Sequence, residues 1–281
     1  MHGGRLHRVT AFATLPTGGN PAGVWVGDAF PSDTEMQQIA ADVGYSETAF
    51  VVPATGLHRR VRYFSPEAEV SFCGHATIAS GVVLGNTEGD GQYVFHTAVG
   101  AVPVAVGLAD GMREAALTSV TPRHEPASDA LLTSVLAALG WRRDEVDEAV
   151  PPARIYAGAW HLVIATRTRE TLAHLAYDFA TLKQLMITDG LTTLQLIWRD
   201  PDGAIHSRNP FPVGGVVEDP ATGASAAALG GYLRDIGLVR APAHLVIRQG
   251  EDMGRPSRIL VEVPTAGGIV VRGTAVSVET R

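Results

Sequence analysis

The sequence predicts an α+β protein made of two related halves, each wrapped around a central helix. Three observations support this fold class: predicted strands outnumber predicted helices, a weak repeat relates the two halves, and each half holds one helix that is apolar on all sides. The chain has 281 residues, which suits two domains of about 150 residues each.

The first half opens with strands and a capped helix. Residues 6–12 and 22–26 are predicted strands on either side of a loop rich in glycine and proline. The capping-box pattern of Ser32 and Glu35 starts a helix with apolar residues at helical spacing, and Gly44 ends it. The apolar run 48–52 predicts a third strand.

The rest of the chain continues this mixture, and Pro151 and Pro152 are its strongest proline punctuation. We expect helices at residues 130–139 and 169–186 and strands at residues 93–106, 159–165, 191–198, 245–249, 259–263 and 269–278.

An internal repeat is the most informative feature. Residues 62–66, Arg-Tyr-Phe-Ser-Pro, recur as residues 208–212, Arg-Asn-Pro-Phe-Pro, and residues 73–79 parallel residues 222–228. In each half a glycine opens a helix of small and apolar residues, at 76–84 and at 224–233. A helix that is apolar around its circumference is buried, so the repeat predicts two duplicated halves, each wrapped around its own helix.

Composition excludes several classes of function. The net charge is −7, so we expect no nucleic-acid or anionic-membrane partner. A single lysine, Lys183, disfavours a pyridoxal-phosphate enzyme, and a single cysteine, Cys73, excludes an intrachain disulfide and a thiolate metal cluster. We find no glycine-rich nucleotide motif and no metal-ligand spacing among the ten histidines, so we expect no cofactor and no metal.

No signal-peptide pattern and no apolar run of membrane-spanning length is present, so we expect a cytoplasmic protein.

The starts of the two apolar helices are candidate sites for a substrate carboxylate, because free amides and the helix dipole favour an anion there. Cys73 and His75 flank the first start, and Glu218, Asp219 and Thr222 flank the second. Other roles stay open: Asp219 before a proline is typical of a helix N-cap, His75 of a structural histidine, and Cys73 of a small buried residue. A helix start also stabilises a thiolate.

Glu47 is a further candidate, since it lies between a glycine-terminated helix and an apolar strand. A glutamate at the start of a strand is most often a solvated surface residue. A carboxyl group at the edge of an apolar surface can also serve as a general acid and base.

At these residues the sequence resembles the PhzF-like family of phenazine biosynthesis, within the diaminopimelate epimerase fold superfamily. The matching motifs span most of the chain; they are residues 19–24 (Gly-Asn-Pro-Ala-Gly-Val), 46–50 (Ser-Glu-Thr-Ala-Phe), 73–77 (Cys-Gly-His-Ala-Thr), 218–223 (Glu-Asp-Pro-Ala-Thr-Gly) and 249–257 (Gln-Gly-Glu-Asp-Met-Gly-Arg-Pro-Ser). Five ordered motifs at family spacing make this resemblance specific.

The resemblance implies two pseudo-symmetric lobes, each a mixed β-sheet rolled around a central helix, with the active site between them. It also implies a homodimer and a last strand that returns to the first lobe. We therefore place the first lobe at residues 1–122 plus 268–281 and the second at residues 123–267. The family's namesake is a cofactor-free isomerase acting on trans-2,3-dihydro-3-hydroxyanthranilate. Its catalytic glutamate, histidine and aspartate correspond to Glu47, His75 and Asp219.

The resemblance also implies a set of substrate-binding residues, which are Asn20, Ser46, Gly74, Gly223, Ala224 and Ser225. The family usually has a serine where Ala224 stands, so a hydroxyl contact is missing here unless Ser225 supplies it. Pro210 likewise stands where an aromatic residue is usual.

We expect a cofactor-independent isomerase that moves a proton on a small carboxylated substrate. An amino-acid racemase or epimerase with two thiols is an alternative, but the repeat pairs Cys73 with Thr222, whose hydroxyl is too weak a base. A non-catalytic small-molecule-binding protein on the same scaffold is the other alternative.

Overall fold

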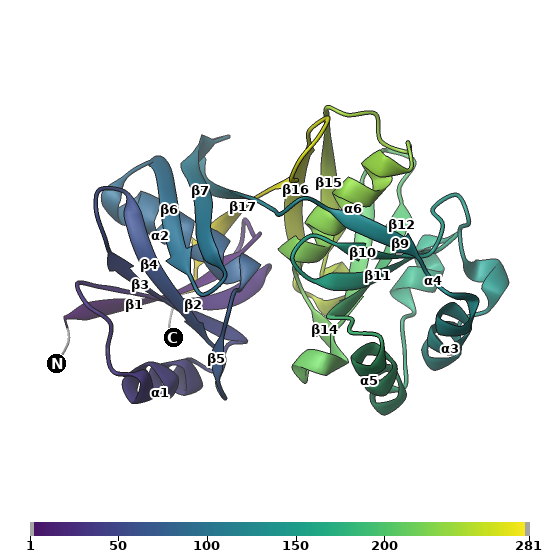
Figure 1. Ribbon diagram of the computed structural model, residues 1–281, viewed down its shortest axis with the longest axis horizontal. Helices are drawn as coiled ribbons and strands as arrows, with labels where there is room; N and C mark the ends of the chain where they lie inside the picture. The colour runs from purple at the N-terminus through teal and green to yellow at the C-terminus, as the bar shows by residue number, and fades with distance from the viewer. Residues whose placement is uncertain (1–2, 279–281) are drawn as a thin grey trace. The chain divides into compact units, whose positions relative to one another are not determined.

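Two units divide the chain, residues 1–118 with 272–281 and residues 119–271, and the computed structural model describes residues 3–278. Both units mix helices and strands, which confirms the predicted α+β class (Figure 1). We describe each unit by itself.

The first unit contains most of the β-structure of the N-terminal half and one strand from the end of the chain. Its elements are β1 (Gly4–Ala11), β2 (Asn20–Gly27), α1 (Asp33–Val43), β3 (Glu47–Pro53), β4 (His58–Phe64), β5 (Glu69–Val70), α2 (Gly74–Glu88), β6 (Gly91–Thr97), β7 (Gly100–Ala109), β8 (Met112–Thr118) and β17 (Val270–Ser277).

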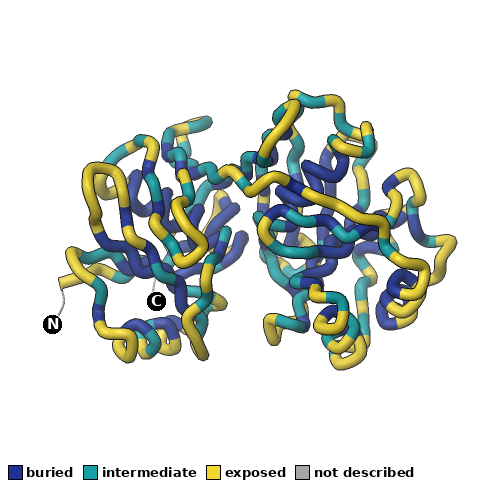
Figure 2. Tube along the Cα trace, in the orientation of Figure 1, coloured by how far each residue is buried: buried dark blue, intermediate teal, exposed yellow. Residues whose placement is uncertain are grey.

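Eight strands of this unit close into a barrel. Their pairings run in the order β1–β2–β3–β4–β6–β7–β8–β17 and return to β1. Helix α2 packs against β1, β2, β3, β7 and β8, and its residues from His75 to Gly85 are buried, as the dark blue trace in Figure 2 shows. A Cβ at Gly81 would lie 2.7 Å from the Cβ of Ala115, so this close approach of helix and strand requires glycine.

Helix α1 covers the outside of this barrel. Met36 and Ala40 pack there with Trp25, Phe50 and Phe64. Side chains alternate between the two faces of a strand, so residues 47, 49 and 51 of β3 share the opposite face, toward α2.

The second unit is built from one continuous stretch of chain. Its elements are β9 (Arg123–Pro126), α3 (Asp129–Leu139), η1 (Arg143–Glu145), β10 (Ala153–Tyr156), β11 (Trp160–Ala165), α4 (Arg169–Ala173), α5 (Phe179–Thr188), β12 (Thr193–Arg199), β13 (Ile205–Pro210), η2 (Pro212–Gly214), β14 (Glu218–Asp219), α6 (Gly223–Asp235), β15 (Ala243–Gln249), η3 (Glu251–Met253) and β16 (Ser257–Val263).

The two units share one order of strand pairing. In the first, β2 and β3 are parallel, β3 and β4 antiparallel, and β4 and β6 parallel across α2. In the second, β11 and β12, β12 and β13, and β13 and β15 repeat this order, with α6 between the last two. Helix α6 packs against β9, β10, β11, β12 and β16 and is buried from Ser225 to Leu233.

Two predicted elements were wrong in extent. The strand expected at residues 93–106 is the hairpin of β6 and β7, because the chain turns at residues 98–99, directly before Gly100 with its left-handed backbone. The helix expected at residues 169–186 is two helices, because Asp178 accepts a hydrogen bond from the Thr181 amide and starts α5 anew.

Among residues 3–278, no helix is long and apolar enough to span a membrane.

Candidate active site

Glu47 is the first residue of β3, on the face that this strand turns toward α2. The left-handed Gly44 ends α1, and β3 begins three residues later, paired with β2. The Glu47 side chain is 20% exposed, and its Oε2 lies 3.4 Å from Nε2 of His75. The Ser46 hydroxyl lies 3.5 Å from the same ring nitrogen. The structure thus brings together three residues predicted from two separate motifs.

His75 lies in the first turn of α2 and has neighbours at both ring nitrogens. The Cys73 sulfur is 3.3 Å from its Nδ1 and 3.8 Å from its Nε2. Both side chains are buried, with 8% of each residue exposed. Glu47, Cys73 and His75 therefore form one compact group with only the carboxyl side partly open.

The starts of the two central helices differ from those of the other α-helices in the described part of the chain. Ser32, Ser128, Thr168 and Asp178 each cap a peripheral helix with a side-chain oxygen. Cys73 and Thr222 occupy the N-cap positions of α2 and α6 without a side-chain cap. The first amides of a helix have no partner inside the helix, so these two starts are suited to an anion.

Gly74, the first residue of α2, adds space to this arrangement. A Cβ built on Gly74 would meet no atom within 4 Å outside its own helix and chain neighbours, so there is open space beside this residue. The turn below it is held in place: the Thr77 hydroxyl donates to the Cys73 carbonyl at 2.7 Å and lies 2.7 Å from the Tyr63 hydroxyl. Burial raises the pKa of Tyr63, which keeps this phenol protonated.

Asp219 ends the short strand β14 of the second unit. Its side chain is not the N-cap of α6, which is Thr222, so the capping role considered for Asp219 is wrong. The Thr222 hydroxyl instead donates to the Asp219 carboxylate. The turn from Asp219 to Thr222 therefore holds a partly exposed carboxylate beside the start of α6.

Gln249 fixes this turn, although the sequence did not predict it as a site residue. Its buried side-chain amide donates to the Asp219 carbonyl at 2.7 Å and to the Thr222 hydroxyl at 3.0 Å, and its oxygen accepts from the Thr222 amide at 3.1 Å. The next residue, Gly250, has φ +74°, and a Cβ there would lie 2.9 Å from the Pro220 carbonyl oxygen. The sequence did contain a sign of this role, because Gln249 and Gly250 are the first two residues of the fifth family motif, residues 249–257.

Three other predicted residues lie at the start of α6. Gly223 is its first residue, and Ala224 is partly exposed. Ser225 is fully buried, and its hydroxyl donates to the Gln195 oxygen. This hydroxyl thus has a hydrogen-bond partner inside the unit, and its predicted contact with a substrate stays a prediction.

Asn20, predicted as a substrate ligand, is the first residue of β2 and is 2% exposed.

The strand registers align the two units residue by residue. Phe50 pairs with Arg62 in the first unit, and Leu196 pairs with Arg208 in the second, so Glu47 corresponds to Thr193. Cys73 and Thr222 correspond as N-caps. The carboxyl, thiol and imidazole of the first unit thus have no ionisable counterparts in the second, where Asp219 is the candidate acidic group.

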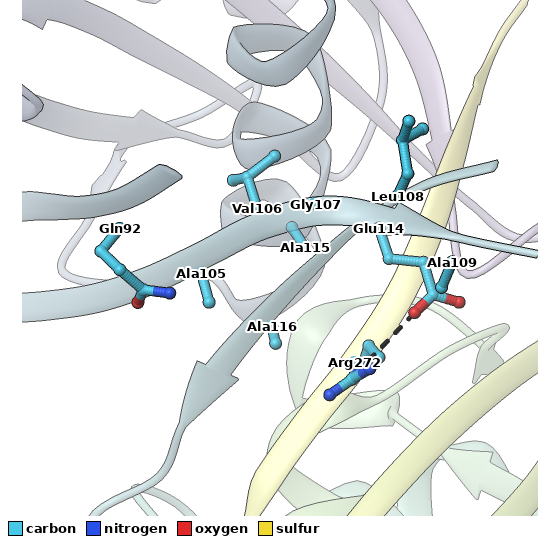
Figure 3. A pocket seen from close by; sticks show the side chains of 10 residues that line it. All are labelled: Gln92, Ala105, Val106, Gly107, Leu108, Ala109, Glu114, Ala115, Ala116 and Arg272. Atoms are coloured by element: carbon cyan, nitrogen blue, oxygen red, sulfur yellow. Dashed lines mark ion pairs between the residues drawn. The ribbon is translucent and has the colours of Figure 1, made fainter. Parts of the chain in front are cut away.

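Two surface pockets are lined by other residues. One, of about 230 Å³, lies on the strands of the first unit, where Glu114 faces Arg272 at 3.8 Å (Figure 3); it is lined by Gln92, Ala105, Val106, Gly107, Leu108, Ala109, Glu114, Ala115, Ala116 and Arg272. The other, of about 250 Å³, lies in the second unit beside Glu218 and Tyr177. Burial, and next Glu218, raise the pKa of Tyr177 to about 12. Neither lining includes Glu47, His75 or Asp219.

Comparison with known proteins shows which family the chain resembles. The model of the family described as phenazine biosynthesis-like protein matches residues 9–281. The uncharacterized isomerase YfhB of Bacillus subtilis is 31% identical over 96% of this chain and 95% of its own length. An uncharacterized isomerase of Deinococcus radiodurans is 31% identical over 94% of this chain and 88% of its own.

Solved structures agree at the level of the fold. A PhzF-family phenazine biosynthesis protein of Enterococcus faecalis is 27% identical, with a TM-score of 0.79 over 99% of this chain and 98% of its own. A PhzF-family protein of Bacillus anthracis, at 23% identity and covering 98% and 96%, has a TM-score of 0.87. A hydroxyproline epimerase of Agrobacterium vitis, 13% identical and covering 99% and 92%, shares the fold with a TM-score of 0.67.

Proposed function

The chain belongs to the phenazine biosynthesis-like family, and from this premise we propose that it is a cofactor-independent isomerase that shifts a proton on a small carboxylated substrate. One observation carries the proposal: the partly exposed Glu47 carboxyl lies 3.4 Å from His75 Nε2. His75 lies in the first turn of α2, and the N-cap residue of this helix, Cys73, makes no side-chain capping bond.

Each group has a distinct part in the proposed reaction. The Glu47 carboxylate takes a proton from one substrate carbon, and the electrons of that C–H bond move into the conjugated substrate. The resulting carboxylic acid returns the proton to another carbon, which regenerates the carboxylate. His75 orients the Glu47 carboxyl and polarises the substrate, and the Gly74 amide and Ser46 hydroxyl bind its carboxylate.

In the second unit we propose that Asp219 contacts the same substrate, with the amides of Gly223 and Ala224 as further hydrogen-bond donors. Gln249 is a positioning residue in this proposal, because it fixes the turn that carries Asp219.

The racemase alternative has less support. Racemisation without a cofactor needs an acid and a base on opposite faces of one carbon, and the fold's two N-cap positions carry Cys73 and Thr222. A threonine hydroxyl does not ionise in the range where a cysteine does.

The substitution Glu47→Gln tests the proposal. It preserves the shape and hydrogen bonding of the side chain but removes its ability to carry a proton. We expect turnover of trans-2,3-dihydro-3-hydroxyanthranilate, the substrate implied by the family resemblance, to fall by about 10²–10⁴ with little change in binding. Proton NMR in deuterated water measures the rate and shows whether the moved proton exchanges with solvent.

The matched control is Glu67→Gln, an exposed glutamate of the same unit, which we expect to leave turnover unchanged. Near-normal turnover by Glu47→Gln would refute the assignment and make Asp219 the next candidate. If the wild-type protein binds this compound but does not convert it, the binding-protein alternative is favoured.

A further inference from the structure

Glu47, Cys73 and His75 bring three kinds of metal ligand to one point. One ligand atom from each lies within 4.8 Å of the other two. From His75 Nε2, the Glu47 oxygen is 3.4 Å and the Cys73 sulfur 3.8 Å away. In a tetrahedral zinc site, with bonds of about 2.3 Å to sulfur and 2.0–2.1 Å to nitrogen or oxygen, neighbouring ligand atoms are separated by about 3.4–3.6 Å. The two distances lie within a few tenths of an ångström of this spacing. The sulfur is nearer to Nδ1, at 3.3 Å, so ligation through Nε2 requires the thiol or the imidazole ring to reorient.

We propose that this group binds one Zn²⁺ and that the bound ion inhibits the isomerase; the inhibitory part rests on the function proposed above. Three protein ligands with an open fourth position are the arrangement of accessible zinc sites. Binding releases the thiol proton of Cys73, and the resulting thiolate and the Glu47 carboxylate together balance the two positive charges of the ion.

The surroundings favour this chemistry. The Cys73 thiolate would form at the uncapped start of α2, where the helix dipole stabilises a negative charge. Cys73 and His75 are buried, whereas the Glu47 side chain is 20% exposed and offers the ion a route in. A carboxylate coordinated to zinc has its lone pair engaged, so Glu47 could no longer accept the substrate proton.

The sequence did not indicate a metal site, because its ligands are not spaced as in a linear motif. The carboxylate comes from the start of β3, and the thiol and imidazole come from the first turn of α2. The barrel brings these two elements together.

Co²⁺ and Zn²⁺ titrations of the metal-free full-length protein test the site. We expect Co²⁺ to produce a thiolate charge-transfer band at one equivalent per chain and Zn²⁺ to displace it. Cys73→Ala should abolish the band and weaken Zn²⁺ binding at least tenfold by calorimetry. The matched control is His58→Gln, which alters the exposed pair formed by His58 Nδ1 and His96 Nε2, 2.9 Å apart. This variant should keep the band.

Activity assays then test the inhibition. One equivalent of Zn²⁺ should suppress wild-type turnover at least tenfold, chelation should restore it, and Cys73→Ala should turn over substrate equally with and without Zn²⁺. Absence of a Cys73-dependent band, equal inhibition of wild type and Cys73→Ala, or activation by Zn²⁺ would overturn the proposal. The band does not depend on turnover, so a Cys73-dependent band in an inactive protein supports the zinc site and places the failure on the proposed isomerisation.

Discussion

At the scale of single residues, the second unit has a buried hydrogen-bond network at the place where the first unit has Glu47. His161 Nδ1 and Thr193 Oγ1 are 2.7 Å apart, and Asn209 joins Thr193 to Gln195 through bonds of 3.3 and 2.8 Å. Thr193 corresponds to Glu47 by strand register. The same place in the fold thus holds a partly exposed carboxyl group in one unit and a buried hydrogen-bond network in the other.

His161 makes the stability of the protein depend on pH. Burial lowers its pKa from 6.5 to about 3, so the folded protein leaves it neutral while the unfolded chain protonates it. The unfolded state therefore binds more protons between these two values. This contribution to stability is fully present above pH 6.5 and is lost as the pH falls toward 3.

We expect His161→Asn, which can keep a bond to Thr193, to flatten the pH dependence of the free energy of unfolding. The slope should decrease by up to about 1.4 kcal/mol per pH unit in this window, the value for one proton. Urea unfolding of both proteins at several pH values from 4 to 7 measures it. Parallel curves would show that His161 does not cause the dependence.

Cys73 has a different status, because the proposed isomerisation does not use its thiol. We expect Cys73→Ala to retain turnover within about tenfold of wild type, well short of the 10²–10⁴ loss typical of a missing acid or base. Steady-state kinetics of the purified variant measure this effect. A thousandfold loss would instead favour thiol chemistry and would require a second base opposite Cys73.

At the scale of elements, one arginine–glutamate pair recurs in the two units. Arg62 of β4 binds Glu69 of β5 through two bonds of 2.7 Å, and Arg208 of β13 binds Glu218 of β14, with a shortest bond of 2.6 Å. Each pair ties a central strand to the short strand that precedes α2 or α6. The pairs differ in burial: 28% and 41% of the side chains are exposed in the first, but 11% and 3% in the second.

Burial predicts unequal effects of the same substitution. Arg208→Met leaves the Glu218 carboxylate buried without its cation and should destabilise the protein by about 3–5 kcal/mol. Arg62→Met leaves Glu69 in contact with water and should cost about 1 kcal/mol or less. Chemical denaturation of the two variants compares them, and equal losses would contradict the argument from burial.

Some helices and strands could be predicted from the sequence and others could not, depending on the residues that form them. The starts of α2 and α6 were predicted correctly, because a glycine followed by a wholly apolar run has few alternatives to a buried helix. β4 was not predicted, because the inward position at its start is the buried Arg59, so the charged run of residues 58–60 shows no alternation of apolar and polar residues. The Gln249 contacts could not be predicted, since they join segments that meet only after folding.

At the scale of the whole molecule, the sequence was sufficient for the family, the fold class and the assignment to the isomerases, all of which are confirmed. The internal repeat predicted the architecture. Its offset of 146 residues, from Arg62 to Arg208, also relates their paired strand neighbours, Phe50 and Leu196. It did not give the difference between the units, which depends on a few polar side chains inside the second. The homodimer, the cytoplasmic location and the substrate stay predictions.

The two units also differ in how the chain builds them, and this difference predicts how each folds. Residues 119–271 supply the second unit without interruption, including a core of its own around Leu132, Leu162 and Leu194. The first unit needs β17, which pairs with both β1 and β8 and closes the barrel. Without that strand, residues 1–118 have two open edges and leave α2 incompletely covered.

We therefore expect a fragment of residues 119–271 to unfold cooperatively on heating, whereas residues 1–118 alone should aggregate or lack a transition. Adding β17 back should restore folding, and the geometry allows a short connection, because the Ser119 amide donates to the Ile269 carbonyl at 2.8 Å. Residues 3–118 joined to residues 270–281 by a linker of about four glycine and serine residues should give a cooperative transition. Circular dichroism melts of the three fragments decide the matter: cooperative unfolding of residues 1–118 without β17 would show that closure of the barrel is not what makes this unit fold.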